Sequence, residues 1–168
     1  AFDWCAPFGC DYETAKAAMK RTHRWLERCI KAKTTTHQAL FPICQGAFFD
    51  DLRKESAAFV SSIPSVGYAI GGLSVGEDKD TMNHFVKLTA PLPPENKPRY
   101  LMGVGTPEDL LDGIKHGVDM FDCVLPTRNA RHGSFFTYEG KKQIKNAQYI
   151  DDPRPLDENC DCYCCKNH

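Results

Sequence analysis

Short apolar runs alternate along the chain with longer stretches in which apolar positions recur at helical spacing. The apolar runs end near Phe2, at Phe41–Cys44, at Tyr68–Ile70, at Tyr100–Met102 and at Met120–Cys123. Each run has the length of a buried strand. Strands that are separated by helices indicate βα units with a parallel sheet and helical cover. The pattern therefore predicts an α/β fold for most of the chain.

Helical periodicity is clearest near the N-terminus, where one face would carry Ala15, Ala18, Met19, Thr22, Leu26, Cys29 and Ile30. A second, weaker helical pattern contains Leu52, Phe59 and Val60. The segment Thr106–Asp109 is typical of an N-cap followed by a first-turn proline and two acids. An apolar stripe follows it, formed by Leu110, Leu111 and Ile114, and Gly117 is a plausible stop.

The pattern changes after about Pro126. Ser134–Tyr138 and Gln143–Ile150 predict two antiparallel strands joined through a Glu139-Gly140 turn. We therefore divide the chain into a βα region, residues 1–128, and a region with a hairpin and a cysteine-rich tail, residues 129–168.

Composition narrows the function classes. The 168 residues carry 21 Lys and Arg against 22 Asp and Glu, and 42% are apolar. These values exclude a disordered chain and a strongly basic binder of the histone type. No apolar run approaches the roughly 18 residues that span a bilayer, so we expect no membrane partner. The nine cysteines are odd in number, scattered and without a secretory signal, which favours a reducing, cytoplasmic compartment over a disulfide framework.

Four of these cysteines lie within the segment Cys160–Cys165. The spacing Cys-x-Cys-x-x-Cys of Cys160, Cys162 and Cys165 can place three thiolates around one tetrahedral Zn²⁺. A closed structural site needs a fourth ligand, for which His168 is the nearest candidate. The alternative is a set of free cysteines in a frayed tail.

Cations gather between residues 123 and 150, where five Lys and Arg residues stand against one carboxylate, Glu139. The cations are Arg128, Arg131, Lys141, Lys142 and Lys145. A solvated face explains them as well as phosphate contact on a nucleic acid does.

Chemically useful residues follow the predicted strands, whose carboxyl ends face the active site in parallel βα folds. Asp3 and Asp122 are carboxylates that could serve as nucleophile, base or hydrogen-bond acceptor, or could simply cap and form ion pairs. Gln45 carries an amide suited to the edge of a base. Gly71-Gly72 and Gly103-x-Gly105 allow a ligand to approach the main chain, although βα turns also need glycine for geometry alone.

Longer motifs carry a family resemblance. Gly71–Glu77, Tyr100–Gly105 and Phe121–Arg131 resemble tRNA-guanine transglycosylases (queuine tRNA-ribosyltransferases) of the bacterial type. The opening Phe2-Asp3-Trp4-Cys5 and the closing Cys-x-Cys-x-x-Cys fall in the family's order, so the resemblance covers essentially the whole chain.

The resemblance implies a TIM (β/α)8 barrel with an inserted zinc-binding subdomain. Such a barrel usually needs about 250 residues. We therefore expect the chain to hold only the C-terminal part of the barrel and an incomplete zinc subdomain, with Ala1 and His168 as cut points. The family's Asp-Ser-Gly-Gly segment, whose aspartate accepts a proton, does not occur in the sequence, and neither does the downstream zinc-binding histidine.

The implied activity exchanges guanine at the wobble position of tRNAs with a GUN anticodon for 7-aminomethyl-7-deazaguanine, in queuosine biosynthesis. By resemblance Asp122 is the nucleophile and forms a covalent intermediate with the ribose. The base would be bound by Asp3, Gln45, Gly72, Leu73 and Met102, and Cys5 and Val75 would select it. The implied RNA contacts are Gly103, Val104, Gly105, Thr106, Pro107, Glu108 and Asp109, and then Thr127, Arg128, Asn129, Ala130 and Arg131.

The family also implies one structural Zn²⁺ per subunit, held here by Cys160, Cys162 and Cys165, and a homodimer in the cytoplasm. Two other functions compete with the base-exchange enzyme. One is a non-catalytic partner subunit, which would be expected to lose Asp122, and the other is a truncated zinc and RNA-binding module. The latter predicts RNA binding without base exchange, and inactivity of the isolated 168-residue chain stays an open outcome even where the parent family is an enzyme.

Overall fold

The computed structural model describes residues 1–167. The chain forms two compact units, Ala1–Cys123 and Val124–His168. The boundary between them lies just before the predicted division at residues 128 and 129.

The first unit alternates helices and strands, as the apolar pattern predicts. In chain order its elements are α1 (Tyr12–Ala32), β1 (Ile43–Cys44), α2 (Asp50–Ser61), β2 (Tyr68–Ile70), α3 (Lys79–Thr89), β3 (Arg99–Leu101), α4 (Pro107–Lys115) and β4 (Met120–Phe121). The four strands form one parallel sheet in the order β1-β2-β3-β4. An α/β fold with a parallel sheet is thus confirmed.

Strand order in this sheet follows chain order without reversal. Ala69 pairs with Ile43 on one side and Tyr100 on the other, and Leu101 pairs with Phe121. A doubly wound sheet reverses its order partway, whereas a (β/α)8 barrel does not. The unit therefore fits a partial TIM-barrel-like fold, and all four strands end at one edge.

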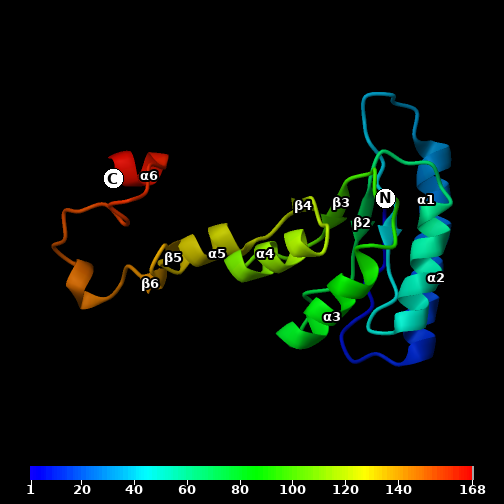
Figure 1. The fold of residues 1–168 in the computed structure, drawn as a ribbon, viewed down its shortest axis with the longest axis horizontal. Helices are drawn as coiled ribbons and strands as arrows, with labels where there is room; N and C mark the ends of the chain where they lie inside the picture. The colour runs from blue at the N-terminus through cyan, green and yellow to red at the C-terminus, as the bar shows by residue number, and fades with distance from the viewer. Residues whose placement is uncertain (168) are drawn as a thin grey trace. The chain divides into compact units, whose positions relative to one another are not determined.

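Helix α1 buries the face that its periodicity predicts. Asp11 caps it by accepting a hydrogen bond from the Thr14 N–H at 2.7 Å. The buried face runs to Leu26 and does not extend to Ile30, which is 41% exposed. Helices α1 and α2 lie side by side along the sheet (Figure 1).

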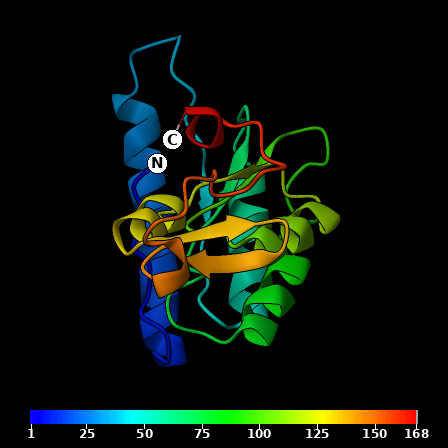
Figure 2. The ribbon, with the colours of Figure 1, turned by 90° about the vertical axis from the view of Figure 1, so that its left-hand side faces the viewer.

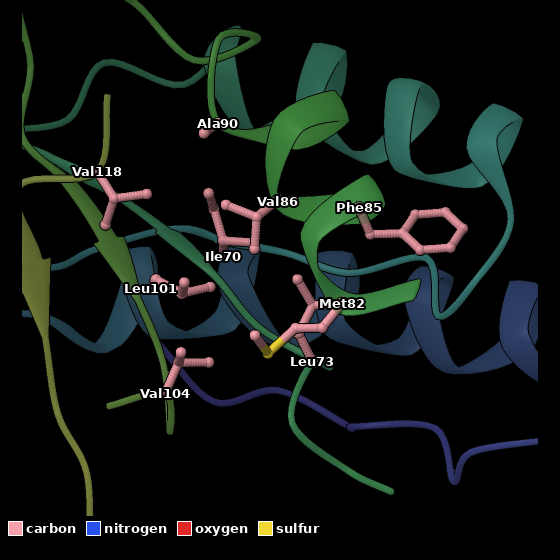
Figure 3. Packing of buried hydrophobic residues seen from close by; sticks show 9 residues of the cluster. All are labelled: Ile70, Leu73, Met82, Phe85, Val86, Ala90, Leu101, Val104 and Val118. Atoms are coloured by element: carbon pink, nitrogen blue, oxygen red, sulfur yellow. The ribbon is translucent and has the colours of Figure 1, made fainter. Parts of the chain in front are cut away.

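The main core lies between the sheet and α3. Figure 3 shows Val86 of α3 beside Ile70 of β2, and Met82 next to Leu73. The apolar pattern did not single out α3 as a helix, but Asp78 caps it through the Thr81 N–H at 2.8 Å. This core fixes the position of the segment after β2, which carries part of the candidate site.

One expectation for the first unit is wrong. No strand forms near Phe2: the Ala1 nitrogen donates one bond to the Phe41 carbonyl at 3.0 Å, but no ladder of strand pairing follows it. Phe2 itself is 76% exposed. On α4, two members of the apolar stripe face solvent, since Leu111 and Ile114 are 70% and 59% exposed.

The second unit contains α5 (Leu125–Arg131), β5 (Ser134–Thr137), β6 (Gly140–Gln143), the 3₁₀ helix η1 (Ala147–Tyr149) and α6 (Tyr163–Asn167). The predicted hairpin is confirmed, and Figure 2 shows its two antiparallel strands. The second strand ends at Gln143, where the sequence pattern placed its beginning. The reason is the tight turn, which pairs Thr137 with Gly140 and so fixes the register early.

None of the described residues between 124 and 167 is fully buried. In the described part of the chain, no helix is both long and apolar enough to span a membrane.

Candidate active site

Four candidate residues follow the four parallel strands directly. Gln45 follows β1, Gly71 follows β2, Met102 follows β3 and Asp122 follows β4. Because parallel strands end at the same edge, the fold places these residues along the carboxyl edge of one sheet. The sequence argument from strand ends thus predicted the common edge at which the structure places these four residues, and their roles in a site stay predictions.

Asp3 and Gln45 form a direct pair. The Gln45 Nε2 donates to Asp3 Oδ2 at 2.7 Å, although Asp3 follows no strand. Gln45 is 1% exposed, and its main-chain N–H donates to Ser56 Oγ at 3.0 Å. These bonds hold the amide and the carboxylate together at the edge of the sheet.

The side chain of a buried histidine, His23, lies within hydrogen-bond distance of Ser56. His23 Nε2 lies 3.0 Å from Ser56 Oγ, and its ring stacks on Phe59 with centroids 4.0 Å apart. Burial lowers the pKa of His23 to about 4, so the ring is neutral near pH 7. Since the Ser56 oxygen accepts from the Gln45 N–H, its hydroxyl proton is available to the imidazole.

Gly71 and Gly72 pack directly against the Gln45 amide. A Cβ at Gly72 would collide with Gln45 Oε1, and Gly72 has φ +71, which side chains rarely adopt. The guanidinium of Arg53, which lies on α2, donates to the main-chain carbonyls of Gly71 at 2.7 Å and Gly72 at 3.0 Å. Glycine at these positions therefore allows a close approach that no other residue permits.

Asp122 accepts two hydrogen bonds on the same oxygen. The Tyr100 hydroxyl donates to Asp122 Oδ1 at 2.6 Å, and the Gly103 N–H donates to it at 2.9 Å. These donors, the hydroxyl first, lower the pKa of Asp122 below its ordinary value. Burial and the bond to Asp122 raise the pKa of Tyr100 to about 12. The site thus offers an exposed, ionised carboxylate with a fixed orientation.

The other predicted base contacts lie in the same unit. Leu73 is buried in the core, Met102 is half-buried, and Cys5 is exposed. Val75 is half-buried and its N–H donates to Glu77 Oε2 at 2.8 Å. Their roles toward a base stay predictions.

The predicted RNA segment Gly103–Asp109 is only partly accessible. Val104 belongs to the core, and Asp109 is buried and paired with Lys79. Asp109 also completes the capping box of α4 with Thr106. Gly103 and the first-turn residues Pro107 and Glu108 remain exposed.

The second predicted RNA segment, Thr127–Arg131, lies in α5. Arg128 and Arg131 are both exposed, whereas Asn129 is half-buried. The Thr127 hydroxyl is used within the helix, where it donates to the Val124 carbonyl at 3.1 Å. The two arginines are therefore the side chains of this helix best suited to contact phosphate.

Cys160, Cys162 and Cys165 come together in the second unit. Their sulfur atoms all lie within 4.8 Å of one another. Thiolates around one Zn²⁺ at about 2.3 Å are about 3.8 Å apart, so the three residues fit the ion. The N–H of Cys165 lowers the pKa of Cys162, which favours the thiolate. His168 lies outside the described residues.

Sequence reasoning missed three supporting residues: Tyr100, Ser56 and Arg53. Tyr100 lies in the motif Tyr100–Gly105, but nothing in the sequence assigns a partner to its hydroxyl. Ser56 and Arg53 lie on α2 and carried no signal of their own. The one clue in the sequence was that both residues are polar and lie at helical positions that should face a sheet.

Comparisons with known proteins identify the relatives of this chain. A family model described as "TGT: Queuine tRNA-ribosyltransferase" matches residues 1–168. Curated proteins named "Queuine tRNA-ribosyltransferase" are 56% identical over 169 residues in Bacillus pumilus (strain SAFR-032) and in Enterococcus faecalis (strain ATCC 700802 / V583). Each match covers 100% of this chain and 44% of the relative. The chain thus spans less than half the length of the curated relatives it matches.

Proposed function

The chain belongs to the queuine tRNA-ribosyltransferase family, whose members are pentosyltransferases, and from this premise we propose that it carries the nucleophile and base pocket of a tRNA-guanine transglycosylase. Members of the family act on tRNA and a 7-deazaguanine precursor base. The proposed reaction exchanges guanine at the wobble position of a GUN anticodon for 7-aminomethyl-7-deazaguanine. Its place is the biosynthesis of queuosine in the cytoplasm.

The observation that carries the proposal is the environment of Asp122. One oxygen accepts from Tyr100 and Gly103, which keeps the carboxylate ionised and leaves its other oxygen without these bonds. An ionised carboxylate held in one orientation is suited to attack on an anomeric carbon.

The proposed chemistry has two displacements. Asp122 attacks the anomeric carbon of the ribose, the glycosidic bond breaks, and its electron pair leaves with guanine. The departing guanine takes up a proton at the ring nitrogen that carried the ribose. The incoming base then attacks the same carbon through its ring nitrogen, gives up the N–H proton it carried there, and the carboxylate leaves, so that one proton is taken up and one released over the exchange. Two inversions retain the configuration, and neither step changes the oxidation state.

Recognition of the base is assigned to the buried Gln45 and the half-buried Asp3. Asp3 accepts from the ring N–H and the exocyclic amine, while Gln45 and the Gly72 N–H approach the carbonyl oxygen. Met102 stacks on the base, the Leu73 carbonyl takes the aminomethyl group, and Cys5 and Val75 select this base. A base without these groups would leave buried polar atoms unpaired, which strongly disfavours its binding.

The target base must leave the anticodon loop to reach this edge, as in other enzymes that act on a nucleobase. The exposed residues after β3 and the arginines of α5 are the proposed RNA contacts. In the whole protein, the proposed arrangement is the C-terminal part of a TIM barrel with a zinc subdomain, in a homodimer.

Zinc is proposed as a structural ion held by Cys160, Cys162 and Cys165. It would tie α6, which carries Cys165, to the residues directly before it, and it would supply no chemistry at the carboxyl edge.

A non-catalytic or truncated zinc and RNA-binding subunit is less well supported. Such a subunit has no need of Asp122, Tyr100 and Gly103 in one hydrogen-bonded group. The names of the relatives also favour the enzyme.

Label exchange tests the proposal. The chain, extended to the full length of its relatives, is incubated with radiolabelled guanine and an unmodified tRNA transcript bearing a GUN anticodon. We expect label in the RNA, no label in the variant Asp122→Asn, and label in Asp119→Asn. Asp119 is the matched control, because it lies just before β4 and accepts from the Arg99 N–H at 2.8 Å. No incorporation by the unaltered chain, or incorporation by Asp122→Asn, would refute the proposal.

A further inference from the structure

Arg53 is a cation in an unusual position. It lies on α2 and is 0% exposed, and the acceptors of its guanidinium are three main-chain carbonyls. A buried charge is costly unless its donors are satisfied. Here all three bonds end in the loops that follow β1 and β2, which are the loops of the candidate base pocket.

The three bonds tie these two loops together. Nε donates to the Ala47 carbonyl at 2.8 Å, in the loop that begins with Gln45. Nη1 and Nη2 donate to the Gly71 and Gly72 carbonyls. The planar fork of an arginine holds several acceptors in fixed directions, which a lysine cannot do.

Because the peptide bond is planar, fixing the direction of these carbonyls also fixes the direction of the neighbouring N–H groups. In a trans peptide the N–H points opposite to the C=O of the same unit, and the structure has no cis peptide among the described residues. Because the Gly71 carbonyl points at Arg53, the Gly72 N–H points away from it. The Gly72 carbonyl likewise directs the Leu73 N–H away from the guanidinium.

We propose that Arg53 is a positioning residue for base recognition, which aims the Gly72 and Leu73 N–H groups at the carbonyl oxygen of the purine. The inference rests on the proposed function, since it assumes a purine at this edge. Arg53 itself does not touch the base. It acts through the two peptide units, in the way that a preorganised donor pair stabilises an oxygen.

Binding selectivity tests this role. Guanine and 6-thioguanine share the ring N–H and the exocyclic amine. They differ at the carbonyl position, where the sulfur of 6-thioguanine is a weaker hydrogen-bond acceptor than the oxygen of guanine. We expect the unaltered chain to prefer guanine, and Arg53→Lys to lose about tenfold of that preference in calorimetric titrations. Val60→Ala is the matched control, because it weakens another buried position on α2, which belongs to a different apolar cluster from Ala47.

A second measurement needs no ligand. In the free chain, ¹⁵N relaxation of Gly72 and Leu73 should give order parameters of about 0.85, and Arg53→Lys should lower them below about 0.6 while Val60→Ala does not. If Arg53→Lys fails to fold, ¹⁵N relaxation of the unaltered chain still tests the proposal. Mobile Gly72 and Leu73 amides beside a rigid β2 would overturn it.

Failure of the proposed function and failure of the proposed role of Arg53 give different results. Absence of guanine binding with a rigid loop that loosens in Arg53→Lys contradicts the proposed function and leaves the anchoring intact. Retained guanine preference, or a loop that stays rigid in a folded Arg53→Lys, contradicts the role of Arg53.

Discussion

At the scale of single residues, the site depends on donors that come from a neighbouring strand. Asp122 follows β4, whereas Tyr100 and Gly103 belong to β3 and its end. The sequence predicted Asp122, because a carboxylate after an apolar run is visible in one dimension. It could not predict Tyr100 as its partner, because that depends on the pairing of Leu101 with Phe121 across the sheet.

Tyr100→Phe removes the stronger donor to Asp122. Because this hydroxyl lowers the pKa of the carboxylate, its loss raises that pKa, and the ionised fraction is lost at higher pH than before. We expect the acid limb of the exchange rate to move to higher pH, and the rate near neutrality to fall about three- to tenfold. The pH profile of label exchange measures both.

Tyr68→Phe is the control for this change. Tyr68 lies on β2 and donates its hydroxyl to the Ile63 carbonyl at 3.0 Å, away from Asp122. An acid limb that shifts equally in both variants would contradict the assignment.

At the scale of elements, local signals predicted helix starts better than strand limits. The Thr106 cap of α4 is present as predicted, because capping is decided within one turn of chain. The hairpin strand was placed too late, since its register depends on which residues the turn pairs. The helix α3 was not predicted, although its buried residues Met82, Phe85, Val86 and Thr89 recur at helical spacing, so the signal was present in the sequence.

The capping box of α4 supplies a stability prediction. Thr106→Ala removes the acceptor of the Asp109 N–H and should lower the free energy of unfolding by about 1 kcal/mol, whereas Thr106→Ser keeps the oxygen and should change it little. Urea denaturation of the two variants measures the difference, and equal losses would contradict it.

The stabilisation that the capping box of α4 provides depends on pH through Asp109. Burial opposes its ionisation, but donors from Lys79 and Thr106 outweigh that effect and lower its pKa. A group with a lowered pKa in the folded state stabilises fully above its ordinary pKa and loses this contribution as the pH falls through the lowered value. Denaturation near pH 7 therefore measures the cap with Asp109 ionised.

At the scale of the whole molecule, the two units differ in what stabilises them. The first has apolar clusters around a sheet, whereas none of the described residues of the second is fully buried. A small unit without a core usually depends on a metal or a disulfide. The cysteine spacing predicted the cluster that the structure brings together, and the missing core could not be read from composition.

Metal removal should therefore unfold only the second unit. With Zn²⁺ we expect proteolysis to spare both units, and with a chelator to degrade residues after Val124 while residues 1–123 resist. Cys162→Ser should mimic the chelator, and Cys164→Ser should not, because Cys164 lies outside the cluster of three sulfur atoms. Identical digestion patterns with and without chelator would contradict a structural zinc.

The central claim is that Asp122 forms the covalent bond to the ribose. Its most direct test is mass spectrometry of the chain, extended to the full length of its relatives, after incubation with unmodified tRNA in the absence of a free base, followed by denaturation and digestion with nuclease and protease. The account predicts a ribose ester on Asp122, none in Asp122→Asn, and the same ester in Asp119→Asn. An ester on Asp3 or another carboxylate, or no ester at all, would contradict it.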